Sequence, residues 1–216
     1  MLPPAQRAIW PLLAEVPRQF VLYGGTAVAL RLAHRASVDF DFFAARAFQP
    51  EDLLNQIPWL RAPEPRLLQR KNNTLSVDAD GPAGAVKLSF LGAIGFGQIR
   101  SPDVCADNGL KIASAEDLLA LKLATVQQRV EAKDYLDICA LLRAGLSLEA
   151  ALGHLEALHP LSTSPIITLK TLVYFSGGDL PTLPAEVKRD LEDAVRMARD
   201  VISFTGVKTE IGALSP

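Results

Sequence analysis

Residues 20–43, FVLYGGTAVALRLAHRASVDFDFF, decide the fold of this chain. The apolar run at 20–23, which ends at two glycines, predicts a short buried strand. Residues 26–35 have the apolar spacing of a helix packed on a sheet, and residues 38–43 alternate as a second strand does. A strand, a glycine turn, a helix and an acidic strand in this order can hold a nucleoside triphosphate and its magnesium at a sheet edge.

The predicted strand 38–43 has an apolar face and an acidic face, formed by Val38, Phe40 and Phe42 and, opposite them, by Asp39, Asp41 and Phe43. The two carboxylates point the same way and repel each other unless a cation lies between them. Mg²⁺ prefers one or two carboxylates together with phosphate oxygens. A solvated strand face is the simpler explanation of an Asp-x-Asp pair, but the apolar opposite face anchors this strand and favours a metal site.

Gly24, Gly25 and Thr26 directly precede the predicted helix. Glycine lets the backbone approach a phosphate closely, and the unpaired N–H groups at a helix start favour anions. A tight connection between strand and helix would explain the two glycines equally well. Their position, one helix ahead of the acidic pair, favours a phosphate site.

The rest of the chain divides into a mixed half and a helical half. In the first half, further helical patterns occur at 6–16 and 49–57, and further strand patterns occur within 66–78 and at 86–91. In the second half the patterns are helical, at 117–129, 132–143, 148–158, 165–175 and 185–204. We therefore expect an α+β protein, with a mixed β-sheet core flanked by helices in residues 1–112 and a helical subdomain in residues 113–216.

The composition argues against several classes of protein. Hydrophobic residues make up 49% of the chain, yet no window approaches the roughly 18 uncharged apolar residues of a membrane span. The start of the chain, MLPPAQRAIW, lacks the pattern of a secretory signal. Cys105 and Cys139 are isolated thiols typical of a core in a reducing cytoplasm, and His34, His154 and His159 lack the spacing of zinc ligands.

The net charge of −2 does not favour nonspecific binding of nucleic acid, so an RNA contact requires a local basic patch. The best candidate patch consists of Arg61, Arg66, Arg70 and Lys71. No aromatic residue interleaves for base stacking, and a solvated hairpin explains the same cluster.

The glycine-spaced segment 91–100, LGAIGFGQIR, is expected to be a loop because no helical pattern follows it.

Three segments resemble motifs of the AbiEii/AbiGii toxin family, within the nucleotidyltransferase superfamily. Residues 24–43 resemble its first motif, a Gly-Gly or Gly-Ser turn followed by a helix, Arg-x-Ser and Asp-x-Asp-Phe. Lys122, Arg129 and KDYLDICALL at 133–142 resemble its distal Lys and Lys-Asp-x-x-Asp segments, and TLKTLVYF at 168–175 is similar to a helix near its C-terminus. These matches cover most of the chain and imply a nucleotidyltransferase-like fold.

The resemblance implies functions for individual residues of the first motif. Gly24, Gly25 and Thr26 would cradle the triphosphate, whereas Asp39 and Asp41 would bind the magnesium ions that neutralise phosphate charge and position the attacking hydroxyl. Two further nucleotide-binding candidates match the family pattern, namely Arg35, which would brace the acidic strand or touch phosphate, and Ser37.

The resemblance also implies a distal set of catalytic residues. Lys122 would contact phosphate as a point charge, and Asp137 matches the distal acidic residue, with Asp134 on the same helical face as the second candidate. Taken without the first motif, Lys122 fits a lysine that extends from an apolar helix to water, and the two aspartates fit a solvated helix face.

The predicted strand 86–91 departs from many polymerase-like nucleotidyltransferases, which place a third carboxylate on a strand beside the Asp pair. Ser89 occupies that position here, and serine cannot serve as a carboxylate ligand or base. Asp78 is a substitute from an adjoining strand, whereas Asp80, next to Gly81, fits a turn residue. Either Asp137 supplies the missing function or activity is reduced.

The leading hypothesis is a cytoplasmic, Mg²⁺-dependent nucleotidyltransferase that moves a nucleoside monophosphate from a triphosphate to a hydroxyl. By resemblance, tRNA is a candidate acceptor, and a toxin restrained by a cognate antitoxin protein is the candidate physiological role. A catalytically degenerate relative that binds nucleotide or a partner protein is the alternative that Ser89 favours. A small-molecule transferase of the antibiotic-adenylating kind ranks last, because nothing in the helical half indicates such a pocket.

Overall fold

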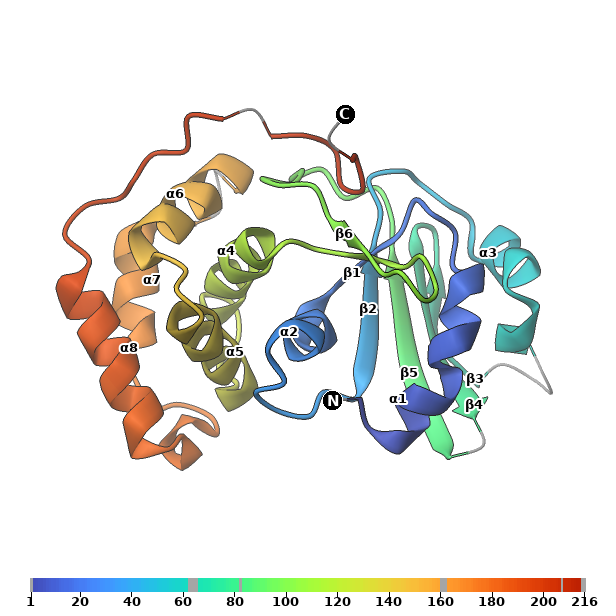
Figure 1. Ribbon diagram of the computed structural model, residues 1–216, viewed down its shortest axis with the longest axis horizontal. Coiled ribbons are helices and arrows are strands. Elements are labelled where there is room, and N and C mark those ends of the chain that lie inside the picture. The colour runs from blue at the N-terminus through green and yellow to red at the C-terminus, as the bar shows by residue number, and fades with distance from the viewer. Residues whose placement is uncertain (1, 62–65, 82, 160–162, 207, 215–216) are drawn as a thin grey trace. The chain divides into compact units, whose positions relative to one another are not determined.

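The computed structural model describes residues 2–61, 66–81, 83–159, 163–206 and 208–214. The chain forms two compact units: Met1–Ser114 together with Thr209–Pro216, and Ala115–Lys208 (Figure 1). The last residues of the chain thus belong to the first unit, which is built around a sheet, whereas the second unit is helical. Within the described ranges, no helix is both long enough and apolar enough to cross a bilayer.

The described residues of the first unit form a seven-stranded sheet with the order β3-β4-β5-β2-β1-β7-β6. Its strands are β1 (Val21–Tyr23), β2 (Asp39–Phe43), β3 (Arg66–Lys71), β4 (Thr74–Gly81), β5 (Gly84–Leu91), β6 (Asp103–Val104) and β7 (Lys111–Ile112). β1 is antiparallel to β2 and parallel to β7, and β2 is parallel to β5. The sheet is therefore mixed, as the predicted α+β class with a mixed β-sheet core requires.

Short helices flank the sheet: α1 (Pro4–Ile9), η1 (Trp10–Glu15), α2 (Gly24–Leu32), α3 (Pro50–Gln56) and η2 (Pro58–Arg61). In Figure 1, α2 lies against one face of the sheet and α1 against the other. On the α1 face, the buried rings of Phe42 and Phe90 stack at 4.9 Å, and Phe20 meets Phe90 edge-on at 5.2 Å. Burial of these large aromatic surfaces holds β1, β2 and β5 together.

The second unit packs its helices around α4 (Ala115–Val126), which contacts α5 (Ala132–Arg143), α6 (Leu148–Leu158) and α7 (Pro165–Leu172). The short η3 (Leu180–Thr182) leads into α8 (Ala185–Met197). Gly145 follows the C-cap of α5 with φ +97°, the left-handed conformation that glycine commonly adopts just after a helix.

Several boundaries differ from the sequence prediction. The helix α2 already begins at Gly24, and β2 begins at Asp39, because Val38 is 63% exposed and lies outside the ladder. The strands β6 and β7 were not predicted, since two residues are too few to show an alternating pattern. The helix expected to reach residue 204 ends at Met197, after which the amide of Ile202 donates to the carbonyl of Glu149.

Candidate active site

The junction between β1 and α2 provides the backbone of the candidate site. Gly24 has φ +71°, a conformation that residues with a side chain rarely adopt. Within the described residues, no side chain caps the N-terminus of α2. The N–H groups of the first helical turn have no intrahelical acceptors and carry the positive end of the helix dipole, so this junction attracts anions.

β2 presents its two carboxylates beside this junction. Phe40 and Phe42 are completely buried on one face, whereas Asp39 and Asp41 are half-buried on the other. A Cβ atom built on Gly24 would overlap the carboxylate of Asp41. The predicted alternation of β2 is therefore present, and its acidic face meets the glycine junction directly.

Arg35 and Ser37 lie over the second glycine. A Cβ atom on Gly25 would overlap the guanidinium of Arg35 and would lie 3.0 Å from the Oγ of Ser37. Arg35 also donates from Nη1 to the carbonyl of Ala36 at 2.9 Å, which keeps the guanidinium near its own backbone. The side chains of the Arg-x-Ser segment and the start of α2 therefore share one site.

Thr26 has a structural task that the sequence did not reveal. Its side chain is buried, and its hydroxyl donates to the backbone carbonyl of Asp39 at 2.5 Å. The amide of Gln6 donates to the same hydroxyl at 3.3 Å. The side chain of Thr26 thus ties α2 to the start of β2, which leaves its backbone N–H as the group available to a phosphate.

β5 places two further side chains on the acidic face. In the register of β2 with β5, Asp41 lies beside Ser89 and Asp39 lies beside Lys87. Ser89 is buried, and the hydroxyl of Ser76 on β4 donates to its Oγ at 3.3 Å. The position next to Asp41 is therefore occupied by Ser89, as the alternation of β5 predicts, and the Ser76 hydroxyl, which was not predicted, bonds to it. Lys87 was missed, although the same alternation places it on this face.

Asp78, the suggested substitute for the third carboxylate, lies on β4, which β5 separates from β2. Asp78 pairs in register with Lys87, which separates it from Asp39, and it forms an ion pair with Arg66 at 3.6 Å. Asp80, expected in a turn, instead lies in β4 and pairs in register with Ala85, with its side chain exposed. Among the residues that the structure describes, no three His, Cys, Asp or Glu side chains form a group able to hold a metal ion. Phosphate and water can supply further oxygen ligands beside the aspartate pair.

The distal candidates form a buried charge cluster within the second unit. The Nζ of Lys122 on α4 lies 2.7 Å from Oδ1 of Asp134 and 2.6 Å from Oδ2 of Asp137, both on α5. Arg129 donates to Asp134 from Nε at 2.8 Å and from Nη2 at 3.1 Å. Both carboxylate side chains are fully buried, so the interpretation of a solvated helix face is wrong, and Lys122 does not extend to water.

The charges of this cluster stabilise one another. Burial alone would raise the pKa of Asp134, but the hydrogen bond from Arg129 and the positive charge of Lys122 outweigh it and hold the pKa below its ordinary value. The neighbouring phenol of Tyr135 responds in the opposite direction. Burial and the negative charge of Asp134 raise the pKa of Tyr135 to about 12, and its hydroxyl donates to the carbonyl of Thr171 at 3.0 Å.

The sequence model described as "Nucleotidyl transferase AbiEii toxin, Type IV TA system" matches residues 12–200 of this chain. The chain belongs to the AbiEii family. This match covers the glycine junction, the aspartate strand and the buried lysine cluster. An uncharacterised protein of Aquifex aeolicus (strain VF5) is 33% identical over 162 residues, which span 72% of this chain and 73% of that protein.

Solved structures share the fold of this AbiEii protein at low sequence identity. A protein of H. pylori described as a candidate nucleotidyltransferase has a TM-score of 0.56 and 19% identity, with coverage of 90% of this chain and 91% of the other. MenT4, a nucleotidyltransferase toxin of Mycobacterium tuberculosis H37Rv, has a TM-score of 0.53 and 14% identity, with 91% of each chain covered. These likenesses support the nucleotidyltransferase fold.

Proposed function

We propose that this AbiEii protein is a Mg²⁺-dependent nucleotidyltransferase that transfers a nucleoside monophosphate from a triphosphate to an acceptor hydroxyl. The approach of the Asp41 carboxylate to the Gly24 backbone carries the proposal, because it combines an anion-attracting helix start with metal-binding oxygens. In the reaction, the hydroxyl oxygen attacks the α-phosphorus and the bond from the α-phosphorus to the bridging oxygen breaks. Pyrophosphate leaves with that electron pair, and the hydroxyl proton passes to a base.

The first unit supplies the groups that hold the triphosphate. The backbone N–H groups of Gly24, Gly25 and Thr26 bind its phosphate oxygens. Arg35 and Ser37, which pack on Gly25, also bind the nucleotide. Arg35 offers a guanidinium suited to phosphate, and Ser37 offers a hydroxyl. Because backbone donors are fixed by the fold, they require little reorganisation when charge develops on the phosphate.

Asp39 and Asp41 fit a magnesium site, since both are half-buried carboxylates on one strand face. Bound there, Mg²⁺ would neutralise phosphate charge and orient the attacking hydroxyl. The hydrogen bond from Thr26 to the Asp39 carbonyl supports this assignment, because it fixes the start of the strand that carries both ligands.

Lys122 and Asp137 complete the proposed catalytic set by their match to the distal motifs of the family. Lys122 uses two of its three N–H donors on Asp134 and Asp137, and the third suits a phosphate oxygen. Asp137 is proposed to take the function of the third carboxylate, which Ser89 cannot perform. The ion pair with Lys122 fixes the Asp137 carboxylate in one position, and this supports a catalytic function for it.

We further propose that the protein acts in the cytoplasm as a toxin, with tRNA as the acceptor and a separately encoded antitoxin as its cognate partner. The family description supports the toxin role. Incubation with each labelled triphosphate and bulk tRNA tests both the nucleotide and the acceptor.

A second candidate, a degenerate nucleotide-binding or partner-binding relative, is favoured by one observation. Ser89 and Ser76 fill the sheet position beside Asp41 where a third carboxylate is expected. Calorimetry that detected triphosphate binding, without turnover of any of the four nucleotides on bulk tRNA, would support this candidate over the transferase.

The decisive experiment replaces both metal-site carboxylates, as Asp39→Ala with Asp41→Ala. We expect the double variant to lose transfer of label from a radiolabelled triphosphate while its circular dichroism spectrum is unchanged. Asp80→Ala is the matched control, because it removes an exposed aspartate of the same sheet and should retain transfer. Wild-type transfer by the double variant would show that the assigned site is wrong.

A further inference from the structure

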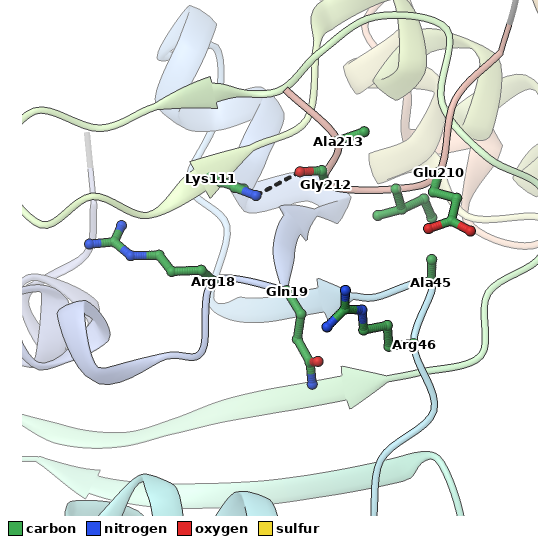
Figure 2. A pocket seen from close by; sticks show the side chains of 9 residues that line it. Arg18, Gln19, Ala45, Arg46, Lys111, Glu210, Gly212 and Ala213 are labelled. Carbon is green, nitrogen blue, oxygen red and sulfur yellow. Dashed lines mark hydrogen bonds between the residues drawn. The ribbon is translucent and has the colours of Figure 1, made fainter. Parts of the chain in front are cut away.

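A second charged site lies at the end of the sheet opposite the aspartate pair. Its cavity has a volume of about 310 Å³ and is lined by residues that include Arg18, Arg46, Lys111 and Glu210 (Figure 2). All four belong to the first unit. The lining contains three positively charged side chains and one negatively charged side chain, so it has a net positive charge within a chain whose overall charge is −2.

The sheet register explains why these residues meet. Val21, at the start of β1, lies beside Phe43 at the end of β2 and beside Lys111 at the start of β7. Arg18 lies just before β1 and Arg46 lies just after β2, so both are at the end of the sheet where Lys111 begins β7. Asp41 pairs with Tyr23 at the other end of β1, so the two sites are separate.

The C-terminal segment completes the cavity and is firmly held. Gln98 is buried and accepts a hydrogen bond from the amide of Gly212 at 2.8 Å, while its own amide donates to the carbonyl of Ala213 at 2.7 Å. The Nζ of Lys111 donates to the carbonyl of Gly212 at 2.6 Å, as Figure 2 shows. One wall of the cavity is thus a fixed segment that brings Glu210 to the rim.

The cations of the cavity retain donors for a ligand. Lys111 donates one of its three N–H groups to the carbonyl of Gly212, and Arg18 donates to the carbonyl of Gly109. In Figure 2 the guanidinium of Arg46 points toward Gln19. Among the residues that the structure describes, no ion pair engages Arg18, Arg46, Lys111 or Glu210.

The electrostatic environment of Lys111 agrees with a site for an anion. Burial, and then the positive charge of Arg18, lower the pKa of Lys111. The positive charges of Arg18 and Lys111 therefore repel each other. An anion bound near them would reduce that repulsion.

The basic cluster predicted from the sequence is a weaker candidate for the same chemistry. Arg66 pairs with Asp78, and Arg70 forms an ion pair with Glu51. Arg61 donates to the amide oxygen of Asn55 at 2.6 Å. Most of the charge on the exposed strand β3 and its surroundings is already directed to acceptors of the protein, as in a solvated hairpin.

We propose that the cavity between Arg46, Lys111 and the C-terminal segment binds a phosphate group. Arginine presents paired N–H donors that match phosphate oxygens, and lysine adds a compact charge. The net positive charge of the lining suits a doubly charged phosphate better than a single carboxylate. The phosphate belongs either to a free phosphate compound or to the backbone of an RNA strand.

The test titrates the full-length protein with inorganic phosphate, pyrophosphate and a short single-stranded RNA, without Mg²⁺, while amide NMR shifts are followed. We expect saturable shifts of Arg46, Lys111 and Gly212. Binding of phosphate or pyrophosphate alone would identify a site for free phosphate compounds, whereas binding of the RNA would identify a backbone contact. Either result supports the pocket, and the absence of shifts with all three probes would overturn it.

Charge variants make the test specific. Arg46→Gln should weaken binding roughly tenfold through loss of a charge-assisted hydrogen bond, and Glu210→Gln should strengthen it severalfold by removing repulsion. Lys71→Gln is the matched control, since this exposed lysine lies outside the cavity. Unchanged affinity in both Arg46→Gln and Glu210→Gln would refute the assignment. Asp39→Ala with Asp41→Ala should leave this binding intact, which separates it from the proposed transferase site.

Discussion

The carboxylate of Asp41 packs against the backbone of Gly24 at a distance that leaves no room for a Cβ atom. The two residues are 17 positions apart in the chain and meet because β1 and β2 pair with Tyr23 beside Asp41. The contact brings a helix start, which attracts anions, against an acidic group, which attracts cations. A magnesium-bound phosphate is a ligand that satisfies both.

Replacement of Gly24 by alanine should damage both stability and activity. The φ of +71° strains any side chain, and the new methyl group would displace Asp41. We expect the free energy of unfolding to fall by about 1–3 kcal/mol and nucleotide transfer to be lost. Gly95→Ala, where a Cβ would meet nothing within 4 Å, should change stability by less than about 0.5 kcal/mol. Urea unfolding measures the stability of the Gly24→Ala and Gly95→Ala variants. Equal stability of the two would contradict the packing described.

Thr26→Val should loosen the start of β2. Valine keeps the shape but removes the hydroxyl that donates to Asp39 and accepts from Gln6. The expected loss is about 1–3 kcal/mol, because the part-buried Asp39 carbonyl and the buried Gln6 amide each lose a hydrogen-bond partner. Thr26→Ser retains the hydroxyl and should recover most of the loss. If valine and serine variants unfold at the same urea concentration, the hydrogen bond does not hold the strand.

Lys122→Met should be strongly destabilising. Asp134 keeps Arg129 as its remaining cation among the described residues, and Asp137 loses the ammonium at 2.6 Å. Both carboxylate side chains are fully buried. Removal of one partner from a buried ion pair costs roughly 3–5 kcal/mol. Lys133→Met is the control, because its pair with Glu131 is exposed and should contribute at most about 1 kcal/mol.

A second variant separates charge from packing in this cluster. Adding Asp137→Asn to Lys122→Met removes the buried negative charge that lost the Lys122 ammonium, so the double variant should be more stable than the lysine variant alone. Chemical denaturation of all three proteins gives the comparison. A strictly additive further loss would argue against the coupling of Lys122 with Asp137.

The stability of the protein should decline in acid through Asp134. Its folded-state pKa is lowered, so the stabilisation is fully present above the ordinary value of 3.8 and is lost as pH falls through the folded pKa. Asp134→Asn cannot titrate. The difference in unfolding free energy between wild type and variant should therefore be largest near neutral pH and shrink below pH 3.8. A difference that stayed constant through the acid range would exclude this linkage.

Local pattern was enough to predict much of the aspartate site. The alternation of β2 follows from the two-residue period of any strand, so Phe40 and Phe42 had to share one face and the aspartates the other. The same period placed Ser89 on the acidic face of β5. It also placed Lys87 there, beside Asp39, but a search for a third carboxylate does not identify a lysine.

Other features depend on partners that are distant in the chain. The burial of Asp134 and Asp137 depends on the packing of α5 against α4, which converts an apparently solvated face into a closed charge cluster. Leu91 belongs to β5, but the rest of the expected loop 91–100 lies outside the named strands and helices. Its Gln98 holds the C-terminal segment, including Thr209, against the rest of the first unit. Nothing in the local pattern around Gln98 indicates such a partner.

The sequence by itself determined the order of strand, glycine junction, helix and acidic strand, and the family to which the chain belongs. These properties follow from backbone periodicity and from motifs contiguous in the chain. Only the tertiary structure decided that Asp41 rests on Gly24, that Arg35 and Ser37 cover Gly25, and that a basic cavity forms at the opposite sheet edge. Contacts of this kind arise from strand register and chain return, which bring together groups whose spacing along the chain carries no record of their proximity.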